Sequence, residues 1–354
     1  MIKYLLFPFL LFSCNTQVKD NLAPEIGKKY TYNTPSYFGD YLLPTNNIAT
    51  EEGIELGRKL FYEPLLSADN SISCASCHIQ SAAFSDPGKF SDGVNGKLGT
   101  RNSMSLANLL WQKKFFWDGR ASSLEQQALM PIQHPDEMNQ TLAQTVSKLQ
   151  SSVVYSSLFK NAFGSEVITA ENIAKAIAQF ERTLISSNSK FDQFLRGEIQ
   201  LSASEERGRQ LFFTHPIAES GLRGGNCGDC HGGNLVGNGS FHNNGLDSIF
   251  SDLGVENQSK SIYDRGVFKA PSLRNIGFTA PYMHDGRFTT LEEVLNHYNG
   301  HLKQSQTLDP LMFVSNELGA KTLKLTENEK KDIIQFLNTL NDTIFVTNPK
   351  FSKP

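Results

Sequence analysis

Two C-x-x-C-H motifs, CASCH at residues 74–78 and CGDCH at 227–231, constrain this chain more than any other feature. In such a motif both thiols form thioether bonds to a porphyrin and the histidine ligates the iron, which is the attachment pattern of c-type haem. The alternatives fit less well: a zinc site would require two distant pairs to converge, a thioredoxin-like motif requires no histidine, and a C-x-x-C disulfide is strained. The sequence therefore predicts two covalently bound haem c groups, held by Cys74, Cys77, His78, Cys227, Cys230 and His231.

The chain also repeats itself around these motifs. GRKLF at 57–61 precedes the first motif, as GRQLF at 208–212 precedes the second. Downstream, Arg101-Asn102 is echoed by Arg274-Asn275, and DGRASSLE at 118–125 is echoed by DGRFTTLE at 285–292. The order is the same in both halves, so we expect two copies of one haem domain with a boundary near residues 188–202. We assign residues 41–195 to the first domain and 196–345 to the second.

Helix signals dominate the remaining pattern. Thr50 is placed to cap a helix, and Thr290 with Glu293 and Thr326 with Glu329 form capping boxes before apolar stripes. The Gly-, Asn- and Ser-rich stretches 86–100 and 214–266 are expected to be loops, and no strong alternating strand pattern is present. These features predict a mainly α fold of two tandem cytochrome c-like haem domains with long loops.

The N-terminus has the pattern of an export signal. Lys3 precedes an apolar run at 4–12 that is too short to span a bilayer. Leu11-Phe12-Ser13-Cys14 then resembles a bacterial lipobox. We predict a lipoprotein signal peptide at 1–13, lipidation of Cys14, a flexible tether at 14–40, and a lipid-anchored protein on the periplasmic side of the envelope. The alternative is an ordinary signal peptide with a chance cysteine.

From about residue 45 to 342 the sequence resembles the bacterial di-haem cytochrome c peroxidase family. The resemblance is carried by both haem motifs and by TRNS at 100–103, FWDGRA at 116–121, LEQQA at 124–128, Pro131, PDEM at 135–138 and APYMHDGR at 280–287. It implies that the first haem reacts with peroxide and that the second accepts electrons from a small cytochrome c or cupredoxin.

The resemblance also implies roles for single residues. Gln127 and Glu137 would line the distal pocket of the first haem, with Glu137 moving the peroxide proton; from the sequence alone, Glu137 would be taken for a solvated loop carboxylate. Trp117 would lie between the haems and help electrons cross. Three positions match those that hold a calcium ion at the domain interface: Asn102, Thr279 and Pro281.

Two departures from the family pattern matter. Many members have a histidine that ligates the first haem at rest, but the matching stretch GVNG at 93–96 has none, so reductive activation is not expected. Many members also place methionine fourteen residues after the histidine of the His-Asp-Gly motif, where this chain has Tyr298. In the internal repeat, Tyr298 corresponds to Pro131, because each lies thirteen residues after the Asp of its Asp-Gly-Arg motif. Two residues are therefore candidates for the sixth ligand of the second haem, Tyr298 and Met283.

Three functions follow from this reading. The first is a cytochrome c peroxidase that reduces hydrogen peroxide to water. The second is a maturase-like oxidase of a protein substrate, resembling the branch that matures the tryptophan-derived quinone of methylamine dehydrogenase. The third is a di-haem electron carrier without catalysis. The net charge of −3, without any block of like charges, argues against nucleic acid as a partner; a homodimer is also considered.

Overall fold

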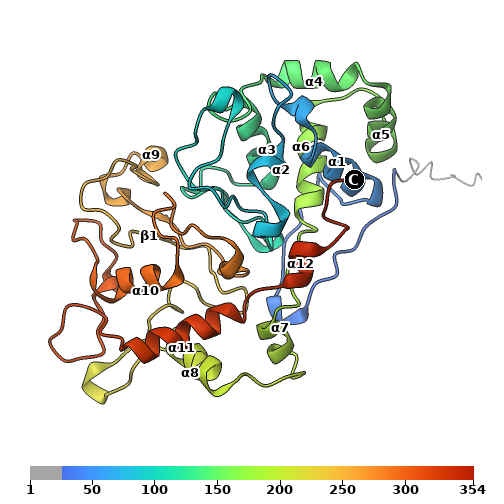
Figure 1. Ribbon diagram of the computed structural model, residues 1–354. Coiled ribbons are helices and arrows are strands. Elements are labelled where there is room, and N and C mark those ends of the chain that lie inside the picture. Colours follow the sequence, from blue (N-terminus) through green and yellow to red (C-terminus); the bar gives the residue numbers. More distant parts are fainter. Residues whose placement is uncertain (1–25) are drawn as a thin grey trace, which may run out of the picture.

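The computed structural model describes residues 26–354 and is mainly helical, as the sequence predicts (Figure 1). The predicted signal peptide and Cys14 lie outside the described residues. Within residues 26–354 the sheet is limited to an antiparallel pair, β1 (Phe241–His242) and β2 (Phe268–Lys269). None of the helices between residues 26 and 354 could span a lipid bilayer.

Along the chain, the helices fall into an N-terminal group and a C-terminal group. The N-terminal group contains α1 (Glu51–Phe61), α2 (Cys74–Cys77), α3 (Leu124–Gln133), α4 (Leu142–Gln150), α5 (Val153–Phe163) and α6 (Ala170–Glu181). The others are α7 (Lys190–Leu195), α8 (Ala203–Phe213), α9 (Glu256–Ser259), α10 (Leu291–Gly300), α11 (Glu327–Asn338) and α12 (Thr343–Thr347).

The three expected helix starts are confirmed. Thr50 Oγ1 accepts a hydrogen bond from Gly53 N at the start of α1. The capping boxes of Thr290 and Thr326 begin α10 and α11. Each cap satisfies backbone N–H groups that the first helical turn leaves without partners.

The same helix crossing is built in both groups. In the first, α1 crosses α6 so closely that a Cβ on Gly57 would lie 1.9 Å from the carbonyl oxygen of Ala176. In the second, α8 crosses α11, and a Cβ on Gly208 would lie 1.9 Å from the carbonyl oxygen of Asp332. Only glycine permits such an approach. The repeated GRKLF and GRQLF segments therefore encode one packing contact twice.

One predicted element of the repeat is wrong. In the structure, the residue of the first half that corresponds to Asn275 is Asn108 and not Asn102. Asn108 and Asn275 each lie ten residues before the Asp of an Asp-Gly-Arg motif, have φ near +60°, and precede the short 3-10 helices Leu109–Trp111 and Ile276–Phe278. Both are buried and hydrogen-bond to Ser186. The Arg-Asn match misled because an identical dipeptide can recur by chance, whereas Asn108 and Asn275 share three features: their spacing to the Asp-Gly-Arg motif, their backbone conformation and the 3-10 helix that follows.

The predicted flexible tether at 14–40 is also wrong for its described part, residues 26–40. Tyr32 and Phe38 are buried, and the backbone of Tyr30 donates to the carbonyl of Ala49. Phe38 packs edge-on against Trp111 at a centroid distance of 5.1 Å. Aromatic burial without a helical or strand period holds this segment on the body of the protein.

The chain end returns to the N-terminal group. Figure 1 shows α12 leaving α11 and the C-terminus lying close to α1. Phe345 and Phe351 share a buried cluster with Phe61, Phe84 and Phe180. The C-terminal residues therefore pack in the core of the N-terminal group of helices and not in that of the C-terminal group.

Candidate functional site

The first C-x-x-C-H motif presents a neutral, oriented imidazole. Its cysteines lie in the single turn of α2, and His78 Nδ1 donates to the carbonyl oxygen of Phe84 at 2.9 Å. Burial lowers the pKa of His78. A neutral ring that donates through Nδ1 keeps the Nε2 lone pair free for a metal.

The second motif repeats this arrangement with a different acceptor. His231 Nδ1 donates to the carbonyl oxygen of Pro271 at 2.9 Å. Burial lowers the pKa of His231 to about 4. Both proximal histidines thus meet the same chemical requirement, although Phe84 follows its histidine by six residues and Pro271 by forty.

The thiols suit haem attachment better than the other roles of cysteine. Cys74, Cys77, Cys227 and Cys230 form no disulfide. Burial raises the pKa of both Cys77 and Cys230 to about 11, opposite to the lowered value of a redox-active thiol. Within residues 26–354, no three histidine, cysteine or carboxylate side chains gather as a metal site. The two pairs therefore do not converge as a zinc site requires.

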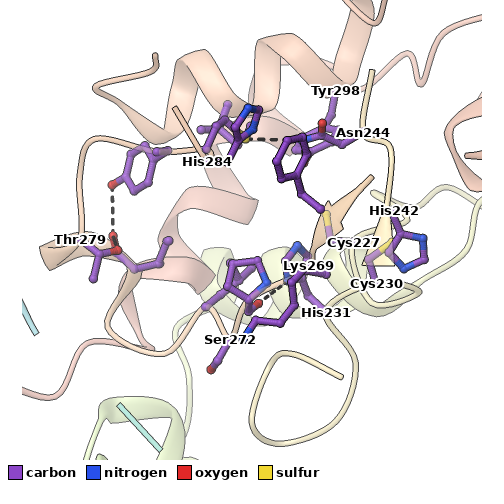
Figure 2. Close-up of a pocket in the computed structure, with 18 of the residues that line it drawn as sticks. Cys227, Cys230, His231, His242, Asn244, Lys269, Ser272, Thr279, His284 and Tyr298 are labelled. Carbon is purple, nitrogen blue, oxygen red and sulfur yellow. Dashed lines mark hydrogen bonds between the residues drawn. The ribbon is translucent and has the colours of Figure 1, made fainter. Parts of the chain in front are cut away.

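A large cavity opens beside the second motif, with His231 and the two thiols on one side and Tyr298, Asn244 and His284 on the other in Figure 2. Aliphatic side chains from α10 and α11 supply much of its remaining wall, including Leu291, Val294, Leu295, Ile333 and Leu337. A cavity with an apolar wall, two thiols and an imidazole fits a c-type haem.

Both candidate sixth ligands of the second haem line this cavity and meet at one amide. Asn244 Nδ2 donates to Tyr298 Oη at 3.2 Å and lies 3.6 Å from Met283 Sδ. Burial raises the pKa of Tyr298 to about 12, and the Asn244 hydrogen bond opposes that rise. Sequence reasoning missed Asn244, which lies in the long 214–266 loop where no spacing singles it out.

The distal candidates of the first motif come from α3 and the loop after it. Gln127 Oε1 is buried and has no hydrogen-bond partner. Glu137 lies ten residues on, with 37% of its side chain exposed and Oε1 3.8 Å from His134 Nδ1. Burial by its neighbours raises the pKa of Glu137, while His134 and Arg120 oppose the rise. An unpartnered amide and a carboxyl of raised pKa are suited to binding and proton transfer.

The stretch that lacks the family histidine packs directly on this carboxyl segment. Val94 N donates to the carbonyl oxygen of Glu137 at 2.8 Å. A Cβ on Gly93 would lie 2.0 Å from the carbonyl oxygen of Asp136. Residues 93–96 therefore fix the backbone of Glu137 and offer no imidazole of their own.

Trp117 belongs to the N-terminal half yet lines the cavity of the second motif. Its indole N–H donates to the carbonyl oxygen of Asn102 at 2.8 Å, and its ring meets His284 edge-on at 6.4 Å. His284 stacks on Phe268 at 3.7 Å. Trp117 thus begins a short run of aromatic rings between the two halves.

The three calcium candidates also line this cavity: Asn102, Thr279 and Pro281. Asn102 Nδ2 donates to the carbonyl oxygens of Gly88 and Lys89. These bonds leave its Oδ1 for another partner, and amide and carbonyl oxygens are ligands that calcium accepts.

Comparison with known proteins agrees with this chemistry. Residues 51–200 match the family model described as di-haem cytochrome c peroxidase. Over 301 residues the chain is 38% identical to the methylamine utilization protein MauG of Methylorubrum extorquens, covering 84% of this chain and 80% of that protein. It is also 38% identical over 246 residues to the cytochrome c551 peroxidase of Nitrosomonas europaea, covering 68% of this chain and 71% of that protein.

A solved structure shows the same fold. The chain superposes on a MauG-like protein associated with microbial copper homeostasis with a TM-score of 0.81 and 33% identity. The match covers 92% of this chain and 99% of that one.

Proposed function

Since this chain belongs to the di-haem cytochrome c peroxidase family, we propose that it reduces hydrogen peroxide to water at the first haem site with electrons that enter through the second. We assign one haem c to each motif, in tandem cytochrome c-like domains at 41–195 and 196–345. The donor is a small cytochrome c or cupredoxin.

The difference between the two distal sides carries this proposal. Around the first motif, Gln127 and Glu137 are available, and residues 93–96 contain no ligating side chain. Around the second, the phenol of Tyr298 and the thioether of Met283 both line the cavity. One site is therefore suited to a small substrate and the other to electron transfer.

Each residue has a definite task in the proposed reaction. The haem supplies an iron that binds peroxide and exchanges electrons. Glu137 takes the proton from the inner peroxide oxygen and returns it to the outer one, so that water can leave. Gln127 orients the oxidant through its free amide group. Trp117 helps electrons cross between the halves.

Two further assignments concern a calcium ion and the attachment of the protein to the cell envelope. Asn102, Thr279 and Pro281 would hold one calcium ion, which ties the halves together through oxygen ligands. Acylated Cys14 would anchor the protein on the periplasmic side of the envelope.

Rapid-mixing kinetics on the holoprotein test the proposal. A reduced small cytochrome c is mixed with the enzyme, and its oxidation is followed with and without hydrogen peroxide. We expect rapid oxidation that depends on both peroxide and enzyme. No peroxide-dependent turnover with any small cytochrome or cupredoxin would contradict the peroxidase assignment.

A maturase-like oxidase is the second candidate, favoured by the placement of Tyr298 in the cavity together with the similarity to MauG. An anionic oxygen ligand favours the oxidised iron and disfavours electron uptake from ordinary donors. This candidate predicts slow turnover with cytochromes and peroxide-dependent oxidation of residues on a bound protein. A non-catalytic carrier predicts neither reaction.

A further inference from the structure

The end of the chain packs against the loop that orients the first proximal histidine. Residues 79–85 form a tight turn in which Phe84 N donates to the carbonyl of Ile79, and Ile79 N donates to that of Ser85. This turn presents the Phe84 carbonyl to His78 Nδ1 at 2.9 Å. The orientation of the imidazole therefore depends on the conformation of Phe84.

That conformation is an unusual one. Ala83 and Phe84 are adjacent non-glycine residues with φ of +53° and +59°. Left-handed backbone is unfavourable for residues with a Cβ and persists only where the surroundings impose it. The surroundings of Phe84 must therefore stabilise this turn.

Those surroundings come largely from the C-terminal residues. The Phe84 ring is fully buried and lies 5.6 Å from Phe345 and 6.5 Å from Phe351, measured between ring centroids. Phe345 and Phe351 also pack against each other at 5.6 Å. Phe61 contributes the remaining aromatic contact at 6.0 Å.

Polar contacts fix the same residues in place. Gln80 Nε2 donates to the carbonyl oxygen of Asn348 at 2.8 Å. From α1 and its end, Arg58 Nε donates to Ser352 O at 2.7 Å, and Tyr62 Oη donates to Phe351 O at 2.7 Å. These bonds use carbonyl groups of the chain end, so they hold its backbone and not merely its side chains.

We propose that the C-terminal segment, residues 343–354, positions the proximal histidine of the first haem site by holding Phe84 in its left-handed conformation. The inference rests on the proposed ligation of that haem by His78. The corresponding acceptor at the second site, Pro271, does not depend on this segment. Its loop is held by the backbone bond from Leu273 N to Val236 O and by the bond from Ser272 Oγ to Leu235 O, neither of which involves residues 343–354. The segment therefore acts on one haem alone.

Resonance Raman spectroscopy of the ferrous holoprotein tests the proposal through the iron–histidine stretching band. Hydrogen bonding at Nδ1 strengthens the iron–imidazole bond. In Phe351→Ala we expect this band of the first haem to move to lower frequency, and peroxide reduction to slow by up to about tenfold, as for other residues that support a metal ligand. Phe351→Leu should restore most of the band position.

Matched variants separate this role from general destabilisation. Ile344→Ala alters an exposed side chain of the same segment and should leave the band unmoved. Gln80→Ala removes the bond to Asn348 without opening a core cavity, and should shift the band in the same direction by less. If Phe351→Ala does not fold, Gln80→Ala alone decides the matter.

An unmoved band in folded Phe351→Ala or Gln80→Ala would overturn the proposal. A change in the reduction potential of the second haem in either variant would also overturn it, because it would show a global effect. If the unaltered protein shows no iron–histidine band and His78→Gly does not change the first haem spectrum, His78 ligation itself is wrong, which is a separate failure.

Discussion

The two haem sites of this protein are alike on the proximal side and different on the distal side. His78 and His231 each donate through Nδ1 to a backbone carbonyl at 2.9 Å, and burial lowers both of their pKa values. For the first, the proposed distal groups are a glutamine oxygen without a partner and a carboxyl of raised pKa. Opposite the second lie a buried phenol and a thioether. Under the proposed function, duplication supplied two equivalent haem-binding motifs, and substitution on the distal side separated their tasks.

Removal of the carboxyl at the first site should have the largest effect. In Glu137→Gln the shape is kept but the proton carrier is lost, so we expect peroxide reduction to fall by about 100-fold or more, within the range for general acid–base groups. Stopped-flow measurement of the peroxide reaction provides the check. Asp136→Asn, which removes the neighbouring carboxylate paired with Lys97, should change the rate little. Equal losses in both variants would remove the catalytic role of Glu137.

At the second site, Tyr298→Phe should change the electron-transfer haem instead. Loss of an oxygen ligand should raise its reduction potential by about 0.1 V, a modest part of the roughly 0.8 V that axial ligands span. Spectroelectrochemical titration measures this shift. Tyr282→Phe, which removes a hydroxyl bonded to the carbonyl of Ile276, is the matched control. If only Met283→Leu moves the potential, methionine is the ligand.

Replacement of the glycine at the helix crossing should destabilise the protein equally in both halves. Gly57→Ala and Gly208→Ala each force a Cβ against a carbonyl oxygen, which should lower the free energy of unfolding by about 1–3 kcal/mol. Chemical denaturation measures both. Gly300→Ala, where no heavy atom lies within 4 Å of the added Cβ, should not be destabilising. A loss in only one of the two glycine variants would show that the crossings are not equivalent.

The smallest expected effect comes from Asn244. Its N–H donates to Tyr298 Oη and so withdraws charge from the phenol oxygen. Asn244→Ala should make that oxygen a stronger donor and lower the potential of the second haem by roughly 40 mV, equivalent to about 1 kcal/mol for one electron. The titration used for Tyr298 applies here, with Asn238→Ala in the exposed part of the same loop as control. A potential that stays unchanged would show that the amide does not tune the ligand.

The haem motifs and the helix caps could be predicted because each depends on residues close in sequence, and the repeat because short segments recur in the same order in both halves. Thr50, Thr290 and Thr326 fulfil their capping roles through contacts three residues away. Asn244 and the Phe351 contact with Phe84 could not be predicted, because each joins segments that are distant along the chain. The roles of Gln127 and Glu137 came from resemblance, since neither spacing nor charge marks them. Packing of Tyr32 and Phe38 was missed because irregular segments carry no periodic signal.

Electron paramagnetic resonance of the ferric holoprotein tests the central claim most directly. If only the first haem has an accessible sixth position, the spectrum should contain one high-spin and one low-spin signal, and cyanide should convert the high-spin signal alone. Two low-spin signals that ignore cyanide, or two high-spin signals that both respond, would contradict the division of tasks between the sites.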